Sequence, residues 1–287
     1  MRFLVLGASG MAGHTIALYL KERGHTVVGF SRRPVVFLDE QVNGDARDQA
    51  LLREAVEEVD PDVVVNCVGV LNGFAEADPK EAAWLNGVLP HYLAEICEGS
   101  RTRVFQMSTD CVFAGNSGPY TEDSVPDGVS VYDRTKAAGE LRDGRNATFR
   151  NSIVGPDRSP DGIGLLNWFM QQSGPVRGWT RAMWTGLTTL ELAKAMERAA
   201  LEGACGLVNM VPDCNISKFD LLRLFSRELR GGEVEVTPDG SVVLDKTLVR
   251  TDFSCSYRPA PYDVQVSEMA SWIQAHKDLY PHYELGR

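Results

Sequence analysis

Short apolar runs alternate along the chain with stretches in which apolar residues recur at helical spacing. The runs are apolar throughout, as expected for strands that helices cover on both faces of a sheet. The strands predicted in the first half are residues 3–6, 26–30, 62–67 and 103–107. The helices predicted there are residues 11–23, 48–59, 80–98 and 130–142. This alternation predicts an α/β fold with a doubly wound parallel sheet.

After about residue 150 the alternation becomes looser. Helical spacing returns over residues 165–172, 190–201 and 218–229. Two short runs, 234–236 and 241–244, are predicted strands. We therefore predict that residues 1–150 form a first domain built on the sheet. Residues 151–287 are predicted to form a smaller, discontinuous C-terminal α/β lobe, with segments that cross back to the first domain.

Composition and charge exclude several classes of function. The net charge of −10 is spread along all 287 residues, whereas nucleic acids and anionic membranes attract basic patches. No apolar stretch approaches the ~20 residues that cross a bilayer, and no signal peptide is expected at the N-terminus. The six cysteines are scattered without a C-x-x-C pair. We expect free thiols in a reducing cytoplasm and no metal site.

Three glycines follow the first predicted strand at intervals of three residues. Gly7 suits a tight turn, Gly10 a close approach of the backbone to a pyrophosphate, and Gly13 the packing of helix on strand. The N-terminus of the next helix offers free N–H groups and a positive dipole. A close-packed turn that binds nothing is the alternative. The position between strand and helix favours a dinucleotide site and a Rossmann-type sheet.

The residues at the end of the second predicted strand indicate which dinucleotide is bound. An acidic residue there usually binds the ribose hydroxyls of NAD, but this chain has Ser31, Arg32 and Arg33. A hydroxyl and two guanidinium groups suit a phosphate dianion, so NADPH is predicted, and NADH stays open. An ordinary solvated loop is the alternative. Asp45 is predicted to accept a hydrogen bond from the adenine amine or to form a turn.

A second group of residues indicates proton chemistry. If residues 130–142 are helical, Tyr132 and Lys136 lie one turn apart on the same face. The ammonium group is expected to lower the pKa of the phenol from about 10 toward neutrality. Thr109, at the end of a strand, would orient a substrate carbonyl. Alternatively, these residues lie on a surface helix and their spacing is incidental. The glycine turn and the Ser-Thr pair at the strand end argue against this interpretation.

Taken together, these motifs resemble the extended short-chain dehydrogenase/reductase family, in its dTDP-4-dehydrorhamnose reductase-like branch. The resemblance extends over nearly the whole chain. Its motifs are residues 7–13, 62–67, 75–76, 108–113, 132–140, 150–155 and 184–189. Two positions depart from the usual pattern of this branch. Cys111 stands where rhamnose-forming reductases often carry tyrosine, and Asp133 where glycine is usual.

The resemblance implies a role for individual residues. Tyr132 would be the general acid that protonates the sugar O4 while hydride arrives at C4. Lys136 would hold the nicotinamide ribose and lower the pKa of the tyrosine, and Thr109 would bind the carbonyl oxygen. Further cofactor contacts are expected from Ser9, Met11, Ala46, Cys67, Val68 and Gly69. Cys111 is interpreted as a small apolar lining residue and not as a nucleophile.

The substrate contacts are predicted from fewer observations. They are Asp110, Asn151, Arg181 and Trp184. Arg181 and Trp184, together with Arg177 and Trp179, are candidates for contact with a diphosphate and for stacking on a base or sugar. Alternatively, the tryptophans belong to the hydrophobic core and the arginines are solvated on the surface. The predicted partner is a small-molecule nucleotide sugar, with no nucleic acid and no membrane, and a homodimer is left open.

The leading interpretation is NADPH-dependent reduction of the 4-keto group of a nucleotide-linked 6-deoxyhexose in nucleotide-sugar, polysaccharide or glycoside biosynthesis. A UDP-linked 2-acetamido-2,6-dideoxy-4-ketohexose is the alternative substrate. A non-catalytic NADP-binding regulatory subunit is the alternative from another class, because the resembled family includes such a partner of methionine adenosyltransferase. The presence of Thr109, Tyr132 and Lys136 favours an enzyme.

Overall fold

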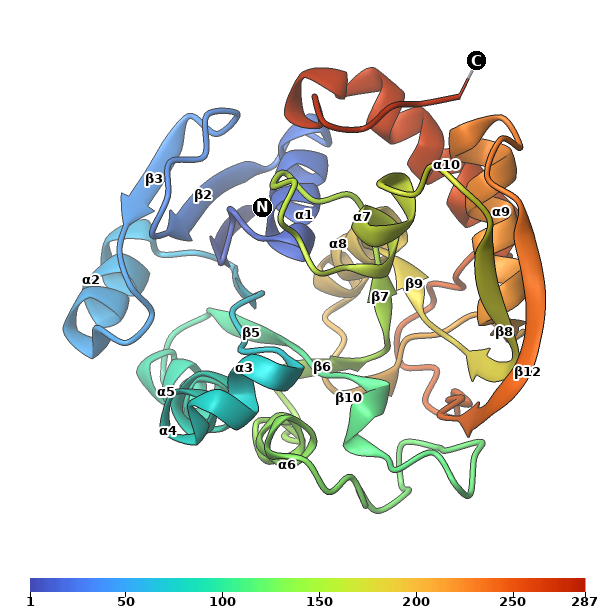
Figure 1. Cartoon of the computed structure of the whole chain (residues 1–287). Helices are drawn as coiled ribbons and strands as arrows, with labels where there is room; N and C mark the ends of the chain where they lie inside the picture. Colours follow the sequence, from blue (N-terminus) through green and yellow to red (C-terminus); the bar gives the residue numbers. More distant parts are fainter. Residues whose placement is uncertain (287) are drawn as a thin grey trace.

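The computed structural model describes residues 1–286 and has a seven-stranded sheet at its centre (Figure 1). Every pair of neighbouring strands in this sheet is parallel, in the order β10-β6-β5-β4-β1-β2-β3. The strands are β1 (Arg2–Leu6), β2 (Thr26–Ser31), β3 (Glu40–Asn43), β4 (Val63–Asn66), β5 (Arg103–Met107), β6 (Ala147–Arg150) and β10 (Gly206–Asn209). The order reverses between β1 and β4, and a crevice at such a switch point is where these sheets bind ligands.

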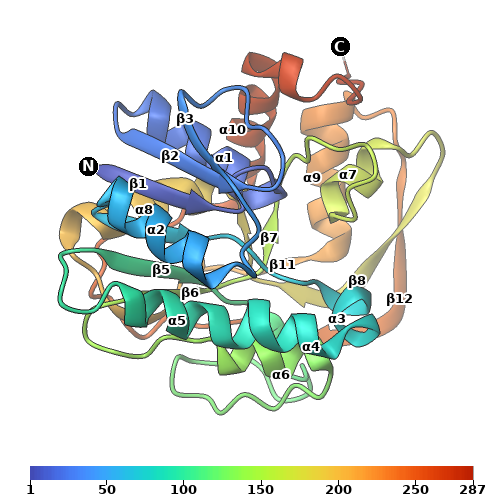
Figure 2. The same ribbon diagram turned by 90° about the vertical axis from the view of Figure 1, so that its left-hand side faces the viewer.

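Helices cover both faces of the sheet (Figure 2). Phe3 and Val5 of β1 pack into one core, against apolar residues of α1 (Met11–Glu22) and α8 (Thr189–Glu202). Leu4 and Leu6 point to the opposite face and a second core. The helices there are α2 (Gln49–Val59), α5 (Leu89–Ile96) and α6 (Val131–Ala138). Burial on both faces explains why the strands are apolar without alternation.

A second lobe lies beside the sheet and has a core of its own (Figure 1). Its three-stranded sheet has the order β11-β8-β12. Its elements are α7 (Leu165–Met170), β8 (Val176–Trp184), β11 (Ile216–Ser217), α9 (Lys218–Arg230), β12 (Val236–Asp245), α10 (Tyr262–Ala275) and the 3-10 turn η3 (Lys277–Leu279). A two-stranded pair, β7 (Ile153–Val154) and β9 (Leu187–Thr188), completes the strands that the structure describes. Strand β10 and helix α8 come from the second half of the chain but join the first sheet.

The predicted strands and helices of the first half are confirmed, with two differences in the helices. The predicted helix 80–98 consists of α4 (Pro79–Ala82), a π-helical turn η1 (Ala83–Val88) and α5. The π turn carries Asn86, whose side chain bonds to both backbone groups of Val70 at 2.8 and 2.9 Å. The predicted helix 130–142 ends at Gly139, where a side chain would collide with the carbonyl oxygen of Asn86.

Other elements were not predicted: β3, β6, the strands from β7 to β11, and two helices. Strand β3 lies at the sheet edge and contains one apolar residue, so no apolar run marks it. The predicted strands 234–236 and 241–244 are one strand, β12, whose register shifts between Asp239 and Val243. Helices α3 (Asn72–Ala77) and α10 were also missed. Within residues 1–286, no helix combines the length and the apolar character needed to span a membrane.

Candidate active site

The glycine turn joins β1 to α1 at the switch point of the sheet. Gly7 has a φ of +75°, which favours glycine, and its N–H donates to the Phe30 carbonyl at 2.8 Å. A side chain at Gly13 would collide with the carbonyl oxygen of Gly7. No side chain caps the start of α1, where Gly10 is the N-cap. The first helical N–H groups therefore remain available to an anionic ligand.

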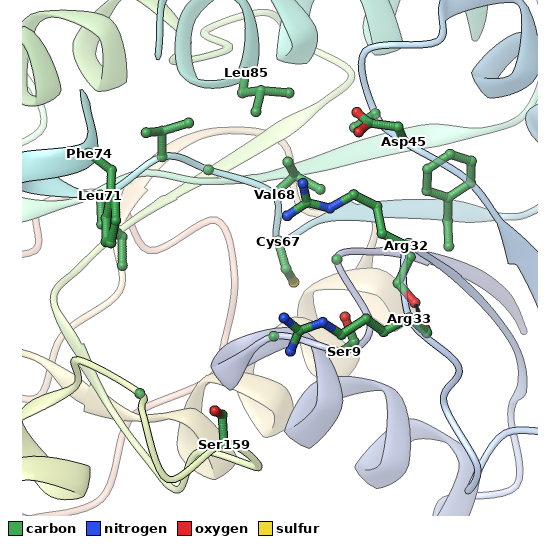
Figure 3. A pocket seen from close by; sticks show the side chains of 18 of the residues that line it. Ser9, Arg32, Arg33, Asp45, Cys67, Val68, Leu71, Phe74, Leu85 and Ser159 are labelled. Carbon is green, nitrogen blue, oxygen red and sulfur yellow. Dashed lines mark hydrogen bonds between the residues drawn. The ribbon is translucent and has the colours of Figure 1, made fainter. Parts of the chain in front are cut away.

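A cavity of about 640 Å³ opens at this turn (Figure 3). The predicted cofactor residues that line it are Gly7, Ser9, Gly10, Ser31, Arg32, Arg33, Asp45, Ala46, Cys67, Val68 and Gly69. Gly13 and Met11 do not line the cavity: Gly13 packs against the turn, and the Met11 sulfur lies beside Gly164. The structure thus brings together residues from the ends of four neighbouring strands, β4, β1, β2 and β3.

Sequence reasoning missed two further walls of this cavity. Leu71 and Phe74, at the start of α3, supply an exposed apolar side. The loop from Asp157 to Ile163 crosses from the second lobe, and the Asp157 N–H donates to the Tyr283 hydroxyl at 2.8 Å. Neither wall has a recognisable motif, because each depends on how distant segments pack.

The two arginines after β2 are exposed, and their guanidinium groups point into the cavity (Figure 3). Neither forms an ion pair within the chain up to residue 286. The hydroxyl of Ser31 donates to the Arg33 carbonyl at 2.6 Å and so fixes the loop. Unpaired guanidinium groups in an open cavity suit a phosphate dianion. Contact of the Ser31 hydroxyl with such a phosphate stays a prediction.

Asp45 lines the same cavity, but its carboxylate is occupied. It accepts hydrogen bonds from the backbone N–H and the guanidinium group of Arg47, at 2.6 to 2.9 Å. Chiefly through these bonds, Arg47 holds the pKa of Asp45 below its usual value. This is the turn-forming role that the sequence left open. An additional contact with adenine stays a prediction.

Tyr132 and Lys136 lie on α6, whose start has a capping box formed by Ser130 and Asp133. Both side chains are buried. The Lys136 ammonium donates to the Met107 carbonyl at 2.6 Å, which ties α6 to the end of β5. Burial lowers the pKa of Lys136 to about 8. Neither Tyr132 nor Lys136 lines the cavity, but the Lys136 ammonium acts on the pKa of Cys67, which does.

The expected lowering of the tyrosine pKa is wrong for this structure. Burial, and then the neighbouring Cys111 and Asp110, raise the pKa of Tyr132 well above its usual value. Thr109 acts in the opposite direction but does not prevail. The sequence showed the helical spacing of Tyr132 and Lys136, but it did not show that the phenol is buried beside acidic groups. The phenol is therefore protonated across the physiological range.

Thr109 caps a short 3-10 turn, η2 (Asp110–Val112). Its hydroxyl accepts from the Cys111 N–H at 3.1 Å and donates to the Asp110 carboxylate at 3.2 Å. Burial raises the pKa of the Cys111 thiol to about 12, so this cysteine is neutral and no activated nucleophile. Burial also raises the pKa of Asp110.

A buried ion pair behind these residues was not singled out from the sequence, although Glu140 belongs to a quoted motif. The Glu140 carboxylate accepts two hydrogen bonds from Arg150, at 2.8 and 2.7 Å, and one from the Ser108 hydroxyl at 2.8 Å. Burial alone would raise the pKa of Glu140, but these partners hold it below its usual value. Because Ser108 precedes Thr109 and Glu140 lies one turn beyond Lys136, this pair fixes the strand end against α6.

The remaining predicted substrate residues do not converge. Asn151 is buried and donates to the Ser152 carbonyl at 3.1 Å. Trp184 is 3% exposed, with its ring 5.6 Å from that of Tyr262. Arg181 is exposed on the opposite face of β8, so it does not face the same side as Trp184. Their contacts with a substrate stay predictions, and for Trp184 the core role is the better supported one.

No cluster of three or more potential metal-ligating side chains occurs in the part of the chain that the structure describes. The candidate chemistry rests on the hydroxyl, phenol and ammonium groups of Thr109, Tyr132 and Lys136. These three groups lie at the carboxyl end of β5 and on the helix packed against it. A protonated phenol beside a carbonyl-binding hydroxyl suits proton donation to a substrate oxygen.

The sheet order and the glycine turn define a Rossmann-type α/β fold. The chain belongs to the RmlD substrate binding domain family, whose model matches residues 1–148. Over 141 residues it is 40% identical to a dTDP-4-dehydrorhamnose reductase of Streptomyces griseus, a match that covers 48% of this chain and 43% of that protein. It is also 32% identical over 142 residues to methionine adenosyltransferase 2 subunit beta of Xenopus laevis, covering 48% and 41%. The matched segment thus spans less than half the length of these relatives.

Solved structures share the whole fold. A dTDP-4-dehydrorhamnose reductase of Bacillus anthracis, in complex with NADP, superimposes with a TM-score of 0.78. The superposition covers 95% of this chain and 99% of that one, at 15% sequence identity. At this identity the likeness establishes the fold, including the second lobe that the family model does not cover.

Proposed function

We propose that this chain is an NADPH-dependent reductase of the 4-keto group of a nucleotide-linked 6-deoxyhexose, acting in nucleotide-sugar, polysaccharide or glycoside biosynthesis. One observation carries the proposal. Cys67 lines the cavity at the glycine turn and experiences the charge of Lys136, which lies on the same helix as the protonated Tyr132 and is tied to the strand end that carries Thr109. A hydride donor and a proton donor would therefore meet at one place.

The cavity residues fit NADPH. The uncapped start of α1 suits the pyrophosphate, and the unpaired Arg32 and Arg33 suit the 2′-phosphate. Lys136, held by the Met107 carbonyl, would reach the nicotinamide ribose. NADPH, when bound, supplies the hydride. The name of the Bacillus anthracis structure, a complex with NADP, supports this assignment, and NADH stays an alternative.

The substrate side needs a group that binds the carbonyl and one that protonates it. Thr109 would turn its O–H from the Asp110 carboxylate to the O4 atom of the sugar and donate a hydrogen bond there. Tyr132 would deliver its proton to that oxygen, because its raised pKa keeps the phenol protonated. The ammonium of Lys136 would stabilise the phenolate that forms, since a positive charge favours the ionised phenol. Asp110 and Asn151 would contribute further sugar contacts.

Two relatives support two different classes of function. The Streptomyces griseus protein is named a reductase, whereas the Xenopus laevis protein is named a subunit of an adenosyltransferase. The intact set of Thr109, Tyr132 and Lys136 favours the reductase, because a binding subunit has no need of a proton donor. A UDP-linked 2-acetamido-2,6-dideoxy-4-ketohexose stays an alternative substrate, on the basis of Cys111.

The test is NADPH consumption by the purified chain with dTDP- and UDP-linked 4-keto sugars, repeated with NADH. We expect turnover with at least one keto sugar and faster turnover with NADPH than with NADH. Tyr132→Phe is the matched control. NADP binding without consumption on any keto sugar would favour the regulatory subunit instead.

The two-domain division at residue 150, a homodimer and a cytoplasmic place of action stay predictions. Analytical ultracentrifugation would test the second of these. The division is best tested by expressing residues 1–150 alone, because β10 and α8 come from beyond that boundary and complete the sheet and its covering helices.

A further inference from the structure

A loop of the second lobe, residues 157–163, forms one wall of the cavity at the glycine turn, and its Ser159 lies across the cavity from Leu85 (Figure 3). Its lining residues are Asp157, Ser159, Asp161, Gly162 and Ile163. The Ser159 N–H donates to the Asp157 carboxylate at 3.0 Å, and a side chain at Gly162 would collide with that carboxylate. None of the five lining side chains is a cation, so this wall does not suit a phosphate. Its hydroxyl and carboxylate groups suit ribose hydroxyls.

Side chains at α7 hold the middle of this loop. The Asn167 amide donates to the carbonyls of Pro160 and Gly162, at 2.9 and 2.7 Å. Gln171, directly after the helix, donates to the same Pro160 carbonyl at 2.6 Å. Residues 157–163 belong to no strand, so these side-chain bonds fix the loop in place of a backbone ladder.

The C-terminal segment holds the start of the same loop. The Tyr283 hydroxyl accepts from the Asp157 N–H at 2.8 Å, and Tyr283 is 8% exposed. Its ring stacks on that of Tyr280, with 5.9 Å between their centres. The Tyr280 hydroxyl bonds to the ring of His14 at 2.8 Å, and the other ring nitrogen of His14 bonds to the Gly10 carbonyl at 2.9 Å. One short segment therefore contacts both the loop and the helix that begins at the glycine turn.

A further contact joins the loop to the segment that follows the two arginines after β2. The Arg158 guanidinium lies 5.4 Å from the centre of the Phe37 ring. The Phe37 carbonyl accepts from Lys21 of α1 at 2.8 Å. Phe37 packs against the first core of the sheet and against the core of the second lobe. The loop is therefore tied to both lobes while it lines the cavity between them.

We propose that Tyr283 is a positioning residue for dinucleotide binding, whose hydroxyl holds the loop 157–163 against the cofactor. This inference rests on the part of the proposed function that places a nicotinamide dinucleotide in the cavity, and not on the keto sugar. Tyr283 acts through the Asp157 N–H. NADP and NAD share the ribose hydroxyls of the nicotinamide half, so both should depend on Tyr283 to the same extent. Arg32 and Arg33, in contrast, should affect NADP alone.

Two variants loosen the loop at different points, and each has a matched control. Tyr283→Phe removes only the hydroxyl. Its control is Tyr257→Phe, whose hydroxyl bonds to Glu191 instead. Thermal unfolding of every variant verifies that it is folded.

Gln171→Ala changes an exposed residue and keeps the test valid if Tyr283→Phe does not fold. Its control is the neighbouring Gln172→Ala, because the Gln172 side chain donates to the Trp168 carbonyl at 2.7 Å and not to the loop. Calorimetric titration with NADP⁺ and with NAD⁺ measures the affinity of each protein without turnover. Hydrogen–deuterium exchange of the peptide that covers residues 157–163 reports on the loop itself.

Loss of one hydrogen bond to the loop should weaken the binding of NADP⁺ and of NAD⁺ by the same factor, about two- to tenfold. Exchange of the loop peptide should be faster in Tyr283→Phe and in Gln171→Ala, because the loop opens more often. Both controls should match the wild type in affinity and in exchange of this peptide. Wild-type affinity of both folded variants would overturn the proposal, and so would a loss confined to NADP⁺.

The result is separable from the proposed reaction. A chain that reduces no 4-keto sugar, but whose Tyr283→Phe variant binds both dinucleotides more weakly, would refute the reaction and keep the positioning role. A chain that reduces a 4-keto sugar while both loop variants keep wild-type affinity would keep the reaction and refute the positioning role. A wild type that binds neither dinucleotide would refute both.

Discussion

The two sides of the cleft around Tyr132 are built in different ways. On the cofactor side, the glycine turn and the two adjacent arginines are each defined by a few consecutive residues. On the substrate side, Tyr132 of α6 is buried beside Asp110 and Cys111, and Glu140 pairs with Arg150, so segments that are apart in the sequence must pack together. A turn that needs glycine at fixed positions can be recognised from a short stretch of sequence. Contacts between charged residues of distant segments form only in the tertiary fold.

The largest effect is expected where the two sides meet. Tyr132→Phe removes the proton donor with almost no change of volume, so folding and NADPH binding should persist. A general acid contributes about 10²–10⁴-fold, and kcat should fall by that factor. Steady-state kinetics at saturating NADPH would measure it. Retention of most of the activity would assign proton donation to another group.

The second change tests the pair that holds strand end and helix together. Glu140→Gln leaves Arg150 with an unpaired buried charge, which typically costs about 3–5 kcal/mol of folding free energy. In the wild type the pKa of Glu140 is lowered, so its contribution to stability is present above the unfolded pKa and is lost as pH falls through the folded value.

Urea unfolding at several pH values would measure both properties of Glu140→Gln. The variant should be less stable at pH 7 and should lack the part of the acid-induced loss that Glu140 causes. Asp161→Asn, at an exposed carboxylate, is the control and should unfold like the wild type. A variant as stable as the wild type would mean that the pair does not hold the site together.

Much of the cofactor side could be predicted from the sequence. The glycine spacing, the Ser-Arg-Arg stretch and the helical spacing of Tyr132 and Lys136 are all local, and each lies where the structure needs it. The direction of the tyrosine pKa could not be predicted, since it depends on burial beside Asp110 and Cys111. The face of β8 that carries Arg181 could not be predicted either, because that strand shows only part of its alternation in the sequence.

A third change tests a contact between the cofactor helix and the C-terminal segment. His14 is buried and its ring bonds to the Tyr280 hydroxyl at 2.8 Å. Burial, supported by the charges of Arg158 and His276, lowers the pKa of His14 from 6.5 to about 4. The folded protein therefore binds fewer protons than the unfolded chain between these values. Stability should fall by up to about 1.4 kcal/mol per pH unit as pH drops from 6.5 toward 4.

His14→Gln keeps a hydrogen-bonding side chain but cannot titrate in this range. Chemical unfolding between pH 7 and pH 4 should show a shallower loss of stability in the variant than in the wild type. Equal slopes would mean that other groups cause the acid sensitivity.

The smallest effect is expected at the open end of the cofactor cavity. Replacing both Arg32 and Arg33 with Ala removes charge-assisted bonds to the predicted 2′-phosphate, which are worth about 1.5–3 kcal/mol. The KM for NADPH should therefore rise roughly tenfold or more, while NADH kinetics stay nearly unchanged. Equal losses with both cofactors would show that the pair only supports the loop.

The most direct test of the central claim is hydride transfer itself. The purified chain would be given NADPH deuterated at the transferred position of the nicotinamide, together with the 4-keto sugar that it consumes fastest. The account predicts one deuterium at C4 of the sugar for each NADPH oxidised, detected by mass spectrometry and NMR, and a transfer that Tyr132→Phe slows by about 10²–10⁴-fold. NADPH bound by the chain without deuterium reaching C4 of any keto sugar in the panel would contradict it.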